Sequence, residues 1–223
     1  MARAKKYSQG VEAPRLDVVD PQELEEVRAD LLGSRQSHDA ELLADADLTD
    51  VDLEGSSFTE CSLERLVLGG AKLRGSRFIE SVIIDSFAPA LSAPRTTWRD
   101  VRVDRPRWGS AEIFDSELQS VRLEGGKIDY LNFRESTLHD VVIESCSIGE
   151  LDLGGVVADR VALIDCRIGS LDVTRARLSS FDLRSSTFDG VSGLEGLRGV
   201  VIDDAQLTLL APALARHVGL IVE

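Results

Sequence analysis

The sequence predicts an all-β solenoid, a fold in which short strands wind into stacked coils. Counting in fives from Leu48 to Phe188 gives 29 positions, and 26 of them carry Leu, Ile, Val, Phe or Trp; only Ala88, Ala93 and Ala158 depart. This period fits neither an α-helix, which repeats every ~3.6 residues, nor a flat strand, which repeats every ~2. Aromatic residues make up only 5% of the chain, as expected for a narrow column of aliphatic side chains rather than a wide globular core.

Residues 1–44 precede the repeat, and we expect them to form an arm followed by a capping helix. Residues 1–19 are polar and unpatterned. Asp20 can cap the start of a helix, Pro21 suits the first helical position, and Glu23 completes an Asp-x-x-Glu capping pattern. The apolar face of that helix would carry Leu24, Val27 and Leu31. It would cover the open edge of the first coil, which could otherwise pair with another chain.

Residues 45–190 consist of five-residue units whose third residue is the large apolar one. The first units are Ala-Asp-Leu-Thr-Asp, Val-Asp-Leu-Glu-Gly, Ser-Ser-Phe-Thr-Glu and Cys-Ser-Leu-Glu-Arg. This pattern resembles that of the pentapeptide-repeat family, Ala-Asp/Asn-Leu-x-x. Asp or Asn precedes the large residue at Asp47, Asp52, Asn132, Asp152, Asp172 and Asp182. The resemblance implies a right-handed, quadrilateral β-helix with four units in each coil.

Residues 87–97 keep the five-residue count but not its character, since they contain two prolines and Ala at both large sites. The sequence leaves open whether they stay in the coil or loop out of it. An arginine-rich stretch overlaps and follows them, with few acids close by. Its members are Arg95, Arg99, Arg102, Arg105 and Arg107. These arginines either pair with acids on neighbouring coils or form a surface for a partner.

Residues 191–223 are expected to form a helical cap or dimerisation segment. Asp203 or Asp204 can start a helix, and Gly219 can end it. In several members of the family that the repeat resembles, a C-terminal helical segment joins two coils into a dimer. By that resemblance, the candidate dimer contacts are Leu207, Leu210, Leu214 and Val218. The alternative is that these side chains are buried against the last coil of their own chain.

The composition bounds the compartment and the class of partner. The net charge of −14 disfavours association with free nucleic acid or an anionic membrane surface. Cys61, Cys146 and Cys166 each lie two residues before a large apolar site, so we expect buried free thiols rather than bridges or metal ligands. An odd number of thiols and the lack of a long apolar run favour a cytoplasmic protein.

Nothing in the sequence indicates a reaction. Nucleotide-binding loops and the Gly-x-Ser-x-Gly motif are absent from the sequence, and His38, His139 and His217 lie in three separate regions. His139 and Asp140 occupy adjacent outward sites, which does not suit a catalytic set. We therefore expect no catalytic residues, no metal and no cofactor, and we interpret the chain as not being an enzyme.

Acidic residues spaced twenty apart would stack on adjacent coils if each coil takes four units. One such column contains Glu60, Glu80, Asp100 and Asp140, and a second contains Glu64, Asp104, Glu124 and Glu144. Stacked like charges are destabilising by ~1 kcal/mol or less per exposed pair, so they call for neutralising arginines or for a partner. Arg102 and Arg122 could be the neutralising arginines. If the acids instead contact a partner, all eight form a partner-binding stripe.

The family resemblance implies a candidate partner for such a stripe. Some members resemble a short segment of B-DNA in shape and acidity and occupy the DNA-binding saddle of type II topoisomerases, DNA gyrase among them. The corresponding function is a non-enzymatic interaction module that inhibits DNA gyrase or topoisomerase IV, or protects it from quinolones. The alternative is a structural or regulatory scaffold that binds an unrelated partner through the arginine-rich stretch.

Overall fold

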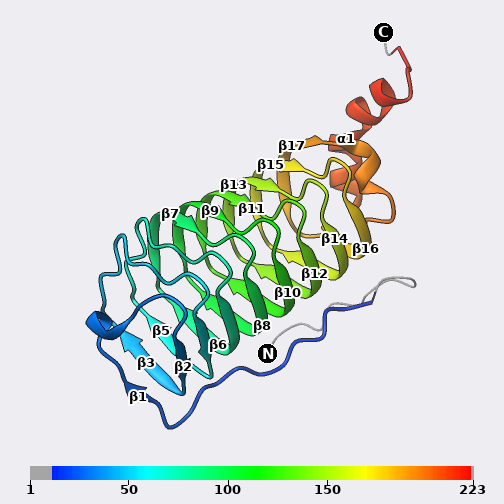
Figure 1. Cartoon of the computed structure of the whole chain (residues 1–223). Coiled ribbons are helices and arrows are strands. Elements are labelled where there is room, and N and C mark those ends of the chain that lie inside the picture. Colours follow the sequence, from blue (N-terminus) through cyan, green and yellow to red (C-terminus); the bar gives the residue numbers. More distant parts are fainter. Residues whose placement is uncertain (1–11, 222–223) are drawn as a thin grey trace.

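The computed structural model describes residues 12–221 and confirms the predicted β-solenoid. The chain winds into a parallel solenoid of about eight turns, with a single α-helix at the C-terminal end (Figure 1). Strand partners are twenty residues apart, as in the pairs Leu118 with Leu138 and Ile128 with Ile148. One coil therefore takes four five-residue units, which is the repeat that the resemblance implied.

Two parallel sheets form the walls of the solenoid. The first sheet contains β1 (Glu25–Glu26), β2 (Ser37–Asp39), β3 (Glu41–Ala44), β4 (Ser57–Thr59), β5 (Ser62–Glu64), β6 (Arg77–Ile84), β8 (Thr97–Asp104), β10 (Glu117–Glu124), β12 (Thr137–Glu144), β14 (Val157–Ile164) and β16 (Arg177–Asp182). The second sheet contains β7 (Phe87–Ser92), β9 (Arg107–Glu112), β11 (Lys127–Asn132), β13 (Ser147–Asp152), β15 (Arg167–Asp172) and β17 (Thr187–Ser192). The register of twenty residues already joins Ser37 to Ser57, ahead of the predicted start of the repeat at residue 45.

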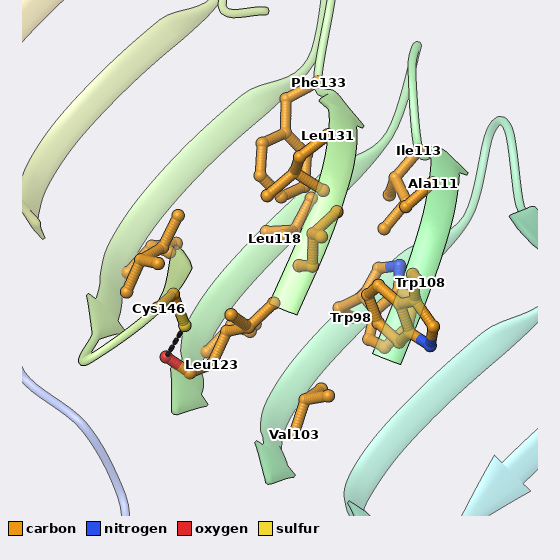
Figure 2. Packing of buried hydrophobic residues seen from close by; sticks show 14 of the residues in the cluster. Trp98, Val103, Trp108, Ala111, Ile113, Leu118, Leu123, Leu131, Phe133 and Cys146 are labelled. Carbon is orange, nitrogen blue, oxygen red and sulfur yellow. Dashed lines mark hydrogen bonds between the residues drawn. The ribbon is translucent and has the colours of Figure 1, made fainter. Parts of the chain in front are cut away.

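The large apolar side chains fill the space between the sheets, and Figure 2 shows part of this column around Trp98, Leu118 and Phe133. Residues 87–97 do not loop out. Phe87 pairs with Arg107 and Ser92 with Glu112, so the register continues through the segment. Its alanines are tolerated because Ala88 lies beside Trp108, whose larger ring occupies the adjacent coil.

The corners of the coils explain two features of the repeat. In one coil, Asp100, Arg105 and Asp115 take the left-handed backbone conformation, with φ of 54°, 50° and 54°. This conformation turns the chain sharply between sides. The Asp that precedes a large residue has a different role, because the Asp47 carboxylate accepts a hydrogen bond of 2.9 Å from the Thr49 amide, which the sheet leaves unpaired.

The predicted capping helix after Asp20 does not form. Residues 12–23 instead run, without helix or strand, along the outside of the first sheet, and we call them the strap (Figure 1). Beyond the strap, β1 pairs with β3 and a 3₁₀ turn, η1 (Ala29–Leu31), follows. Val27, Ala29 and Leu32 pack against the core, so this segment still covers the first coil. The capping signal at Asp20 was outweighed by the pairing that β1 gains at the open edge of the sheet.

The last coil is closed by η2 (Leu194–Leu197) and α1 (Asp204–His217). Asp203 caps α1 as expected, since its carboxylate accepts the Gln206 amide at 2.9 Å while Gln206 Oε1 accepts the Asp203 amide at 2.9 Å. Gln206 also donates to the carbonyls of Leu183 and Ser186 at 2.7 and 2.6 Å. No helix within residues 12–221 is long and apolar enough to cross a membrane.

Candidate partner-binding surface

The first predicted acidic column lies along one corner of the first sheet. Glu60, Glu80, Asp100, Ser120 and Asp140 follow one another at this corner, each with a left-handed backbone, and we call them the corner column. Glu60 and Glu80 are exposed, whereas Asp140 is only 7% exposed. The sequence therefore placed the four acids in one column correctly but did not show that their surroundings differ.

The second predicted column is largely neutralised by arginine. Arg102 Nε lies 3.1 Å from the Asp104 carboxylate, and Arg122 contacts the carboxylates of both Glu124 and Glu144, at 3.0 Å in the first case. Glu64 pairs with Arg65 at 2.8 Å, on the same coil. Arg102 and Arg122 thus have the neutralising role that the sequence allowed them. These four acids offer little uncompensated charge to a partner.

Asp140 is also engaged within the molecule. Arg160 Nε and Nη2 donate to its two carboxylate oxygens, each at 2.7 Å, and the Arg15 amide donates to Oδ1 at 2.8 Å. Burial acts to raise the pKa of Asp140, but these donors outweigh it and hold the pKa below its usual value. His139 lies beside the same carboxylate at 3.3 Å, in an ion-pair network rather than a catalytic set.

The strap crosses the corner column at a regular interval. The Arg15 amide contacts Asp140, the Asp17 amide donates to Ser120 Oγ at 3.1 Å, and the Val19 carbonyl accepts from Arg102 at 3.4 Å. Two residues of the strap therefore advance by one coil. Two extended residues span ~6.6 Å and adjacent coils are ~4.8 Å apart, so the strap must cross the coils obliquely.

An acidic cleft lies between the strap and the N-terminal part of the corner column. We define this acidic cleft by the six carboxylates that line it: Asp17, Asp20, Glu23, Glu60, Glu80 and Asp100. Asp100 is 3.8 Å from Arg99 Nε. The carboxylates of the other five make no hydrogen bond or ion pair with any residue among 12–221. The cleft therefore gathers five carboxylates without a partner among residues 12–221, and three of its six acids belong to the predicted stripe.

The arginine-rich stretch does not form one surface. Arg95 lies 3.6 Å from Asp115, and Arg105 forms two hydrogen bonds of 2.8 Å with Asp85. The latter pair holds the pKa of Asp85 below its usual value. Arg99 and Arg102 lie on β8 beside Asp100 and Asp104, as described above. Four of the five arginines thus pair with acids on the same or adjacent coils.

Arg107 is the exception, and it belongs to a different surface. No side-chain hydrogen bond or ion pair joins it to the described part of the chain. It lines a shallow hollow on the second sheet together with Lys127, Gly109 and Phe87, whose ring is 48% exposed. The hollow also contains Asp85, Arg105 and Asp129. An exposed aromatic ring beside cationic side chains was not identified from the sequence, although Phe87 is the one aromatic residue among residues 87–97.

The four candidate dimer contacts divide into two pairs. Leu210 is 4% exposed and Leu214 is partly buried against the core, so both pack against their own last coil. Leu207 and Val218 are 51% and 69% exposed. Leu210 and Leu214 therefore follow the alternative of packing within the chain, whereas Leu207 and Val218 are exposed and could contact a second copy.

The thiols offer no reactive site. Cys61, Cys146 and Cys166 are buried and free, as predicted. Burial raises the pKa of Cys61 to about 11, which keeps it protonated at neutral pH. Among residues 12–221, no group of three or more His, Cys, Asp or Glu side chains is placed to hold a metal ion.

Comparison with known proteins identifies the repeat. Residues 42–78 match the family model for pentapeptide repeats, with 8 copies. No curated protein matches the chain. Similar solved structures include QnrB1, a plasmid-mediated fluoroquinolone resistance protein, with 15% identity over 89% of this chain and 96% of that chain and a TM-score of 0.48. HetL, involved in heterocyst differentiation regulation in the cyanobacterium Nostoc sp. strain PCC 7120, has 16% identity over 79% of this chain and 94% of that chain and a TM-score of 0.35.

Proposed function

We propose that the chain, whose residues 42–78 match the family model for pentapeptide repeats, acts as a non-enzymatic interaction module that presents the acidic cleft to a basic surface of a partner protein. The observation that supports this function is the convergence of six carboxylates, of which only Asp100 has a cationic neighbour within 4 Å among residues 12–221. A cationic side chain of a partner would relieve the repulsion among them. Continuous strand pairing holds the coils beneath the cleft. Glu60, Glu80 and Asp100 therefore keep their spacing when a partner binds.

The partner that we propose is a type II topoisomerase, DNA gyrase or topoisomerase IV, whose basic DNA-binding surface the protein would occupy. The family resemblance and the charge support this choice. The uncompensated acids occupy the cleft rather than the whole column, so the electrostatic contact would be local and not spread along the rod as in a long DNA mimic. The same charge disfavours direct binding of nucleic acid or of an anionic membrane.

A gyrase supercoiling assay tests this function. The protein is expected to inhibit supercoiling, or to protect gyrase from a fluoroquinolone, and the effect should weaken as the salt concentration rises. A variant with Glu60→Gln, Glu80→Gln and Asp100→Asn should lose most of the effect. The matched control is Glu150→Gln, Asp165→Asn and Asp189→Asn, which removes the same charge from exposed residues outside the cleft and the hollow. If both variants lose the effect on gyrase equally, the effect depends on the net charge of the protein and not on the acidic cleft.

The second candidate is a scaffold that binds an unrelated partner through the arginine-rich region. The observation that favours it is the hollow at Arg107 and Lys127 beside the exposed ring of Phe87. A partner for this surface would carry acidic and apolar groups. A pull-down that is lost with Phe87→Ser and Arg107→Ser, and kept with the three changes in the cleft, would favour this candidate over the first.

The proposed module is a homodimer formed through its C-terminal helix. Leu207, Leu209 and Val218 are exposed at 51%, 49% and 69%, and such side chains gain free energy when a second copy covers them. Sedimentation equilibrium is expected to show a dimer that Leu207→Glu with Val218→Glu converts to a monomer. A wild-type monomer at micromolar concentration would contradict this arrangement.

A further inference from the structure

The strap forms one wall of the acidic cleft and the solenoid forms the other. Asp17, Asp20 and Glu23 come from the strap, whereas Glu60, Glu80 and Asp100 come from the corner column. The walls are built differently. The acids of the solenoid are fixed by strand pairing on both sides, while the strap belongs to neither sheet. The geometry of the cleft therefore depends on whether the strap is docked.

The strap is anchored by few contacts. Two amides, those of Arg15 and Asp17, donate to Asp140 and Ser120, and Arg102 donates to the Val19 carbonyl. Val19 is 9% exposed, while its neighbour Val18 is 95% exposed. Among the described residues, the buried Val19, the partly buried Ala13, Pro14 and Leu16, and three hydrogen bonds thus hold the anchored part, which lies over the coils of Asp100, Ser120 and Asp140. The acids Asp20 and Glu23 lie beyond these anchors.

The charges across the cleft oppose docking. Three carboxylates of the strap face three of the solenoid. The nearest cations are already engaged, since Arg99 lies beside Asp100 and Arg102 beside Asp104 and the Val19 carbonyl. Arg15 pairs with Glu12 on the strap itself. In the free protein, repulsion across the cleft is therefore balanced against the anchoring contacts.

We propose that the strap is a movable wall that closes over a cationic segment of a partner: positive charge in the cleft removes the repulsion and stabilises the docked strap. This inference rests on the proposed function, since it takes the acidic cleft as the binding site. The occupant is a lysine- or arginine-rich stretch of protein, which would contact strap and solenoid together. By reciprocity of linked equilibria, a docked strap strengthens binding of that segment.

A matched pair of variants tests the role of the strap. Val19→Asp places a charge in the buried anchor, and Val18→Asp adds the same charge at the exposed neighbour. Hydrogen exchange at the Arg15 and Asp17 amides should rise at least about tenfold in Val19→Asp and much less in Val18→Asp, which adds the same charge to the cleft without disturbing the buried anchor. With oligolysine as the probe, Val19→Asp should bind about tenfold more weakly than Val18→Asp. Oligolysine should also slow exchange at both amides in the wild-type protein.

Salt provides an independent readout. In the absence of oligolysine, exchange at the two amides should become slower as salt screens the repulsion, although the same salt weakens binding of the probe. A second pair of variants removes a strap contact without adding charge. Ser120→Ala deletes the acceptor of the Asp17 amide, while Ser180→Ala lies in the same column and has no hydrogen bond to a described residue. Only Ser120→Ala should raise exchange at Asp17.

Three results would overturn the proposal: equal exchange in Val19→Asp and Val18→Asp, tighter oligolysine binding by Val19→Asp, or faster exchange when oligolysine is added. The second and third would show that the strap covers the site instead of completing it. Failure of the proposed function has a different signature. In that case the gyrase effect survives Glu60→Gln, Glu80→Gln and Asp100→Asn, whereas the response of the strap amides to salt and to Val19→Asp is unchanged.

Discussion

Ala88 pairs in register with Trp108 on the adjacent coil, and both side chains are buried, at 0% and 3% exposure. The indole Nε1 donates to the Ser86 hydroxyl at 3.1 Å. A large ring on one coil thus accompanies a methyl group on the coil below it, where the repeat loses its large residue.

Trp108→Ala should therefore be among the most destabilising single changes. Loss of a buried Trp costs ~3–5 kcal/mol, and here Ala88 offers no neighbouring volume to fill the cavity. Urea unfolding followed by circular dichroism measures the loss. Phe87→Ala, at an exposed ring on the preceding coil, should cost less than ~1 kcal/mol. Similar losses in the two variants would contradict the packing described for residues 87–97.

The five-residue period predicted the solenoid and the buried thiols because both follow from which side chains must face inward. The coil of twenty residues was implied by the family resemblance, and the strand register confirms it. It could not place residues 87–97, since compensation by Trp108 involves a residue twenty positions away. The strap was missed for a related reason. Its contacts join Asp17 to Ser120 and Arg15 to Asp140, and no local pattern in a polar N-terminal segment reports such partners. The helix expected after Asp20 rested on local capping signals alone.

The candidate surface was predicted in part. The sequence placed Glu60, Glu80 and Asp100 in one column, and strand register confirms this stacking. The acids Asp17, Asp20 and Glu23, which complete the cleft, were not identified because they reach it only through the path of the strap.

Gln206→Leu should open the C-terminal end of the solenoid. The Gln206 side chain is 5% exposed and donates to the carbonyls of Leu183 and Ser186. Its loss leaves the buried Ser186 carbonyl without a donor, at ~1–3 kcal/mol, and removes one of the two donors to the Leu183 carbonyl, which keeps the Ser186 amide at 3.1 Å. The melting temperature should fall markedly, whereas Gln119→Leu, at an exposed site on β10, should leave it nearly unchanged. An unaffected melting temperature in Gln206→Leu would show that the last coil needs no such cap.

Asp140→Asn should cost stability at neutral pH but not in acid. The pKa of Asp140 is lowered in the folded protein, so its ionised form stabilises the fold above the unfolded pKa of ~3.9, and this contribution is lost as the pH falls through the folded pKa. Urea unfolding at neutral pH should separate wild type from the variant, and the difference should shrink as the pH falls below ~3.9. Asp129→Asn, at an exposed carboxylate, serves as the control. A difference that does not change with pH would indicate loss of packing rather than of charge.

The three thiols should react slowly with Ellman's reagent in the native protein and rapidly after unfolding. Cys61, Cys146 and Cys166 are buried, and the pKa of Cys61 is raised to about 11 by burial. Rapid reaction of any one of them in the native state would show that its coil opens locally.

Hydrogen exchange of the protein bound to DNA gyrase tests the central claim most directly, because it locates the partner on the surface. The account predicts slower exchange at residues 17–23 and at the amides around Glu60, Glu80 and Asp100, with little change around Phe87, Arg107 and Lys127. Protection confined to the surface around Phe87, Arg107 and Lys127 would contradict this account. So would unchanged exchange at a gyrase concentration high enough to saturate binding.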